Sequence, residues 1–233
     1  MMQQILALVR LRLRLGRDFL PFQLAVDLLL PLGVAGLLAT GTPAGARPRL
    51  ALGVLLVSSV LSLFRLPAFL LMMDRVFGRG ELLASAGVDK SAYLASQAVG
   101  ALGLSLLPIV AYGGACLWLQ TPIRGEMSFW TAYGLYAAVL YGGSLTVGSV
   151  FRDFNGFTAT INSVVLVTAA ICPVYYPLEQ APPVLQPVLE LLPPGAAAQL
   201  MSSPRPAVVG LLSLGVWALA LLVVGHRCAA AAR

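Results

Sequence analysis

The side chains that could carry out chemistry in this chain are few and far apart. His226 is the only histidine and follows the last long apolar stretch, so neither a catalytic triad nor a histidine metal cluster can be built around it. The P-loop pattern G-x-x-x-x-G-K-[ST] does not occur. The spacing of Cys116, Cys172 and Cys228 matches neither a metal site nor a disulfide framework. We therefore expect no catalytic residue, no metal and no ATP hydrolysis by this chain itself, and cysteines that serve as small packing residues.

Two ionisable residues lie inside long apolar stretches, Asp27 and Arg65. A charge within lipid costs roughly 3 kcal/mol or more, so such residues usually pair or face a cavity. Both lie about two helical turns from the same edge of their stretches. We predict a structural ion pair between them. A transport role is an alternative for both residues, and Arg65 could instead extend its aliphatic part to the membrane edge.

The composition requires a membrane around these residues. Of the 233 residues, 59% are hydrophobic and 10% are charged, whereas soluble domains carry about 25% charged residues. A helix needs about 20 residues to cross a hydrocarbon layer of about 30 Å. Six such spans and short connections use nearly all of residues 1–233, which predicts one all-α membrane domain and leaves no room for a soluble one. The predicted spans are 19–39, 50–73, 92–119, 129–150, 157–176 and 207–225, and the third is predicted to kink at Pro108.

The basic residues in the connections predict the orientation. One side of the predicted topology has ten basic residues and the other has four, Arg47, Arg49, Arg124 and Arg205. The positive-inside rule therefore places both termini in the cytoplasm, and the expected location is the bacterial inner membrane. The positive charge lies mostly at span ends, so topology explains it better than a nucleic-acid partner does. The ten are Arg10, Arg12, Arg14, Arg17, Arg75, Arg79, Lys90, Arg152, Arg227 and Arg233.

The N-terminal residues 1–18 are predicted to form an amphipathic helix in the membrane surface. Apolar residues recur at spacings of three and four, beside several arginines. A solvated basic tail is the alternative. The apolar positions are Ile5, Leu8, Leu11 and Leu15.

The loop 74–91 is the only long polar connection on the cytoplasmic side. It contains a short helical pattern around residues 81–84, which suits docking to a soluble partner. Leu82 and Leu83 would be apolar anchors, Glu81 would meet an opposite charge, and Gly80 and Gly87 would bracket the helix. A connector without a special role is the alternative. The predicted coupling residues are Gly80, Glu81, Leu82, Leu83, Ala84, Gly87 and Val88.

The outer segment 177–206 is rich in proline, which removes backbone donors from a helix. Irregular backbone at membrane depth is tolerated only where protein or a water-filled cavity covers it. We predict a re-entrant segment with a short helix around residues 184–192; an ordinary outer loop with an interfacial helix is the alternative. The residues assigned to it and its approach are Pro173, Tyr175, Tyr176, Pro177 and Pro183. In the fourth span, Phe129, Tyr133 and Tyr136 share a face, which predicts packing or interface anchoring rather than a path.

Three pieces of the chain resemble, in the same order, the ABC-2 family of ATP-binding-cassette exporter permeases. They are the basic start ILALVRLRLRLGRDF, the loop RGELLASAGVDKSAYLASQ, and the stretch CPVYYPLEQAPPVLQPVLELLPPG before the last span. The third is similar to the family's succession of an apolar run, Tyr-Pro, a Leu-Pro-like turn and a proline-bearing segment. The chain departs from the family at Pro194 and Gly195, where Asn-Pro is frequent, and its short outer loops leave no extracellular domain.

The resemblance implies a permease subunit that exports an amphipathic or hydrophobic substrate such as a drug, lipid, glycan or secondary metabolite. It also implies a second permease copy, most simply in a homodimer, and separate cytoplasmic ABC ATPase subunits that bind ATP and Mg, while this chain holds no cofactor. Membrane lipid would surround it. Two alternatives remain: a heme-exporter-like subunit of cytochrome assembly, and a membrane-embedded lipid-modifying enzyme. Such enzymes usually place several His, Asp or Glu residues at the membrane edge.

Overall fold

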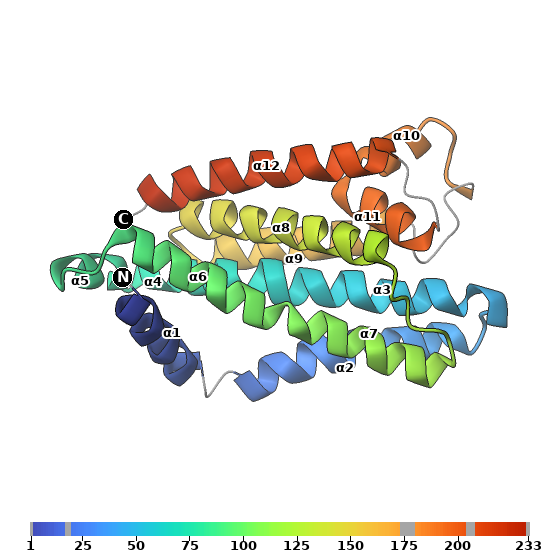
Figure 1. The fold of residues 1–233 in the computed structure, drawn as a ribbon, viewed down its shortest axis with the longest axis horizontal. Coiled ribbons are helices and arrows are strands. Elements are labelled where there is room, and N and C mark those ends of the chain that lie inside the picture. Colours follow the sequence, from blue (N-terminus) through green and yellow to red (C-terminus); the bar gives the residue numbers. More distant parts are fainter. Residues whose placement is uncertain (1, 17–19, 173–179, 204–207, 232–233) are drawn as a thin grey trace.

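The chain folds into an elongated bundle of helices. A computed structural model describes residues 2–16, 20–172, 180–203 and 208–231. These residues form helices and no strand, which confirms the all-α prediction. The long helices run along the long axis of the bundle; both termini and α5 lie at one end, and α10 and α11 lie at the other (Figure 1).

The helices follow the apolar stretches of the sequence. Among the described residues, three helical segments are long and apolar enough to cross a membrane: Ala44–Val76, Lys90–Leu119 and Val208–Ala231. Shorter apolar helices cover Met2–Leu11, Ala25–Ala39 and Phe154–Thr168. The elements are α1 (Met2–Gly16), α2 (Leu20–Ala39), η1 (Ala44–Ala46), α3 (Arg47–Ser59), η2 (Val60–Arg65), α4 (Leu66–Val76), α5 (Arg79–Ser85), α6 (Lys90–Leu104), α7 (Leu106–Leu119), α8 (Met127–Val150), α9 (Phe154–Ile171), α10 (Gln186–Leu191), α11 (Pro193–Ser202) and α12 (Val208–Ala231).

Prolines follow two places in the described helices where the backbone pattern changes. The segment η2 is a π-helix that ends two residues before Pro67. Since Pro67 cannot donate to the carbonyl four residues earlier, a shift of the hydrogen-bond ladder just before it has a physical cause. The helix pair α6 and α7 breaks at Ser105, three residues before Pro108, as the predicted kink requires. Tyr133 on α8 donates to the Ser105 carbonyl at this break (2.9 Å).

Helix α8 packs against α12, α4, η2 and α11 and forms the centre of the bundle. Glycines let neighbouring backbones reach it. A Cβ added at Gly142 would lie 2.6 Å from the backbone carbon of Leu221 on α12, and one at Gly148 would lie 2.6 Å from the Ala68 carbonyl oxygen on α4. Gly225 on α12 faces the Gly142 carbonyl in return. Small residues at such crossings let helices in lipid approach closely enough to pack.

The aromatic face of α8 is a packing surface. Phe129, Tyr133 and Tyr136 are all buried, which confirms the packing interpretation over anchoring at the membrane surface. The Phe129 ring stacks on Tyr112 of α7, with ring centroids 5.5 Å apart. Phe129 and Tyr133 thus contact the α6–α7 pair, while Tyr136 lies on the side of α8 that faces α9 and the start of α11.

The described part of the outer segment contains two short α-helices, α10 and α11, where the sequence predicts one. Helix α10 ends at Leu191, and Pro193 and Pro194 begin α11, whose residues from Gly195 to Met201 are mostly buried. Proline at the first positions of a helix is favoured, while it ends the preceding helix. The Leu191 carbonyl accepts hydrogen bonds from Ser213 Oγ (2.8 Å) and Trp217 Nε1 (3.1 Å) of α12. The irregular turn between α10 and α11 is therefore satisfied by side chains.

The α8–α12 crossing makes a direct prediction. Gly142→Ala places a methyl group against the α12 backbone, and we expect a loss of about 1 to 3 kcal/mol in unfolding free energy from overpacking. Gly134→Ala is the matched control on the same helix, because its added Cβ meets no atom within 4 Å. The control should be neutral or stabilising, since alanine is the better helix former. Unfolding midpoints of the purified variants in one detergent measure both; equal midpoints would contradict the close crossing.

Candidate functional site

The predicted coupling helix is present as α5 and is bracketed by two glycines in the left-handed region. Gly78 has φ 63° and Gly87 has φ 74°. Gly87 was predicted to close the helix, and it does. The prediction that Gly80 opens it was wrong: Gly80 lies inside α5, and the sharp turn before the helix is made by Gly78. A non-glycine residue would be strained at either bracketing position.

A network of hydrogen bonds and one ion pair fixes the start of α5. The Asp74 carboxylate accepts a hydrogen bond from the Tyr93 hydroxyl (2.9 Å) and lies 3.6 Å from an Arg79 nitrogen. Gln97 Nε2 in turn donates to the Tyr93 hydroxyl oxygen (3.3 Å). The Arg79 guanidinium lies 5.3 Å from the centre of the Phe77 ring. Asp74, at the end of α4, is thus joined to α6 by hydrogen bonds and to the first residue of α5 by an ion pair.

The two leucines of α5 have different environments. Leu83 and Val88 pack against a small buried cluster, whereas Leu82 is 66% exposed. The cluster joins α1, α4, α6, α8 and α12 at this end of the bundle, and Gln4 of α1 lies within 3.5 Å of the Gly87 carbonyl oxygen. Leu83 therefore holds α5 on the bundle, and Leu82 presents an apolar side chain outward, beside the exposed Glu81 and Ala84. The cluster consists of Leu8, Leu71, Tyr93, Leu94, Leu145 and Ala229.

A polar groove of about 510 Å³, here called the end groove, runs beside α5. Arg75 Nη1 is buried and has no hydrogen-bond partner among the described residues. Arg152, in the exposed α8–α9 turn, borders the same groove. Two guanidinium groups and the Glu81 carboxylate therefore surround one concave space. The lining residues are Asp74, Arg75, Val76, Gly78, Gly80, Glu81, Arg152 and Ala231.

Of the two residues predicted to pair inside the membrane, Asp27 and Arg65, Asp27 is in contact with Ser62. Asp27 is fully buried on α2, and its Oδ2 lies 3.1 Å from Ser62 Oγ on η2. Ser62 Oγ also lies 2.8 Å from the Ser58 carbonyl oxygen. Arg65 is the last residue of η2, after Ser62 in the same helix, and is partly exposed. Within the described ranges, the ion pairs are those of Arg79 and Arg124, so pairing of Asp27 with Arg65 stays a hypothesis.

Most of the residues predicted for the outer segment lie outside the described ranges. Pro173, Tyr175, Tyr176 and Pro177 lie outside the described residues, and Pro183 is exposed before α10. Arg124, in the connection before α8, donates to the Met201 carbonyl at the end of α11 (2.9 Å). Cys116 and Cys172 are buried and Cys228 is partly buried.

Sequence reasoning missed the end groove and the exposed apolar residues before α5. Val76 and Phe77 are about half exposed, so apolar side chains are exposed just before α5 as well as at Leu82 on it. The groove combines residues from α4, α5, the α8–α9 turn and the end of α12, which no local pattern brings together. The run Asp74-Arg75-Val76-Phe77 was a possible signal, because apolar residues there interrupt a polar loop.

Comparison with protein families gives one match over most of the chain. The family model described as ABC-2 type transporter matches residues 4–203. No curated protein matches the chain.

Proposed function

We propose that this chain, which belongs to the ABC-2 type transporter family, is the permease subunit of an exporter driven by a separate ATPase. Members of this family are membrane components of transporters and are not enzymes by themselves. The observation that carries the proposal is α5, a short helix fixed to the bundle by Leu83 with Leu82 exposed beside it. The cargo would be amphipathic or hydrophobic: a drug, a lipid, a glycan or a secondary metabolite.

The apolar surface on and before α5 fits a protein partner. Leu82 is 66% exposed, Phe77 56% and Val76 49%. Burying apolar area contributes about 25 cal/mol per Å², so three such side chains against a cytoplasmic ABC ATPase would supply a central anchor. Because Leu83 packs on a cluster that includes Tyr93 of α6, and Arg79 pairs with Asp74 at the end of α4, a partner that displaced α5 would also act on α4 and α6.

The end groove supplies the charges for the same partner. Arg75 has no described partner for its buried Nη1, and Arg152 lies at the rim. An acidic side chain of the ATPase would fit between them, while Glu81 would meet a basic one. Charge complementarity of this kind fixes the register of a docked partner. ATP and Mg would bind on the ATPase chain.

The arrangement of the ends supports one orientation. The N-terminus, the C-terminus and α5 lie at the same end of the bundle (Figure 1). We place that end in the cytoplasm, with α2, α3–α4, α6–α7, α8, α9 and α12 as six spans and α10–α11 as the re-entrant outer segment, in the bacterial inner membrane.

The permease would work as two copies. One set of six helices cannot readily enclose a path while shielding it from lipid, and a two-fold axis is the commonest symmetry of protein oligomers. Exposed apolar side chains cover α2 and α12, among them Leu29, Leu37, Leu212 and Val216. A homodimer, or a heterodimer with a similar chain, would use part of this surface, and lipid would cover the rest. The copy number in the purified complex tests this.

Labelling of single cysteines tests the orientation. After Cys228→Ser removes the one half-buried thiol, we expect Ser85→Cys to resist a membrane-impermeant maleimide in intact cells and Ser202→Cys to react. Both positions are exposed, so accessibility in opened membranes provides the control. Reaction at Ser85→Cys but not at Ser202→Cys in intact cells would reverse the topology.

Leu82 provides the test of coupling. Truncating an interface anchor costs about 1 to 4 kcal/mol, and a charge in its place costs more. We expect Leu82→Asp to leave the permease in the membrane and to reduce ATPase co-purification at least tenfold. Ser85→Asp is the matched control, because it adds the same charge to an exposed position of α5 without removing an apolar side chain. Glu81→Arg should impair transport-stimulated hydrolysis more than binding.

Two results would contradict docking through Leu82. Wild-type co-purification and stimulated hydrolysis in Leu82→Asp would move the coupling contact away from α5. The N-terminal helix α1 would then be the next segment to examine. Equal loss in Ser85→Asp would show that charge, and not the apolar anchor, decides docking.

A further inference from the structure

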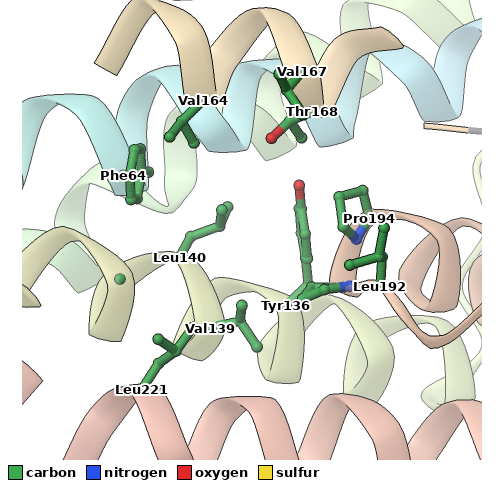
Figure 2. A pocket seen from close by; sticks show the side chains of 12 residues that line it. Phe64, Tyr136, Val139, Leu140, Val164, Val167, Thr168, Leu192, Pro194 and Leu221 are labelled. Atoms are coloured by element: carbon green, nitrogen blue, oxygen red, sulfur yellow. The ribbon is translucent and has the colours of Figure 1, made fainter. Parts of the chain in front are cut away.

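A second concave site lies in the middle of the bundle, far from α5. It is a half-enclosed cavity of about 230 Å³ between α8, α9, α12 and the start of α11. Figure 2 shows Val164, Val167 and Thr168 of α9 on one side, and Tyr136, Val139 and Leu140 of α8 on the other. Leu192, Pro193 and Pro194 close one end, and Phe64 and Leu221 complete the wall. A dry apolar cavity of about 150 Å³ is enough to hold a benzene ring.

One polar group inside this cavity is left without a partner. The Tyr136 side chain is fully buried, and its hydroxyl has no hydrogen-bond partner in the described parts of the chain. Figure 2 shows this hydroxyl and the Thr168 hydroxyl directed toward the same space from opposite sides. A buried hydroxyl without a partner is costly, so a bound molecule that supplies one hydrogen-bonding atom would be stabilised there.

The lining also limits what can bind. All twelve lining residues are uncharged, and an ion in such surroundings would lose its hydration without compensation. Tyr136 lies near the middle of α8, so lipid ester groups at the membrane surface are not expected to reach it. An ordinary acyl chain would therefore fill the volume without satisfying the hydroxyl.

We propose that this cavity binds a small uncharged lipophilic molecule whose apolar body contacts α8 and α9 and whose single hydrogen-bonding group pairs with Tyr136. The molecule enters from the lipid side past Val167, which is 53% exposed at the rim. Thr168 stands opposite as a second hydroxyl contact. The proposed binding does not depend on the proposed function. That the bound molecule is also the exported cargo does rest on the proposed function, and it would limit the cargo to neutral lipophilic molecules.

Photolabelling of the purified permease in lipid nanodiscs tests the site. The probe is a trifluoromethyl-phenyl-diazirine that carries one benzylic hydroxyl, and the matched probe carries a carboxylate in its place. We expect saturable adducts on peptides of α8 and α9 with the alcohol, and no saturable adducts there with the carboxylate. Tyr136→Phe keeps the ring and removes the hydroxyl, so the half-saturating concentration should rise about three- to tenfold.

Two tryptophan substitutions separate the site from the general lipid surface. Val167→Trp should block the rim and abolish saturable labelling. Leu166→Trp is its control, because Leu166 is exposed on α9 and does not line the cavity. Labelling that never saturates, or that survives in Val167→Trp, overturns the site. An unchanged half-saturation in Tyr136→Phe overturns the hydrogen bond. The measurement needs neither ATPase nor transport, so its failure is distinct from a failure of coupling at Leu82.

Discussion

The contact on which this structure most depends is the backbone crossing of α8 and α12 at Gly142 and Gly225. Lipid tails are as apolar as leucine, so helices in a membrane gain little from hydrophobic burial and must pack closely to associate. The two glycines allow this, and Gly148 does the same toward α4. Since α4 leads into α5 and α12 ends beside the end groove, the central helix α8 fixes the parts of the proposed coupling surface relative to one another.

A second constraint is that backbone groups away from water need partners. The structure meets it at its irregular points with side chains from other helices. Tyr133 donates to the Ser105 carbonyl at the α6–α7 break, Arg124 to Met201 at the end of α11, and Ser213 and Trp217 to Leu191. Among the described residues, the buried Tyr136 hydroxyl has no hydrogen-bond partner, and it borders the cavity to which we assign a ligand.

The sequence predicted what depends on local chemistry. Apolar length predicted the long helices, Pro108 the break between α6 and α7, and the loop pattern the existence of α5. What depends on tertiary contact was not predictable. Gly80 and Gly78 are equally good candidates for a turn until the backbone angle of Gly78 is known. Only the packing shows that Leu83 faces the bundle and Leu82 faces outward. The contact of Asp27 with Ser62 required the relative placement of α2 and η2.

The central claim is that this chain is one membrane subunit of a transporter whose ATPase is a separate chain. Native mass spectrometry of the complex, purified through a tag on the permease from its own host in mild detergent, tests it most directly. We expect two permease chains, or one with a similar partner chain, together with two ATPase subunits that are lost in Leu82→Asp. A complex with a single permease chain, or one that never contains an ATPase, would contradict the account.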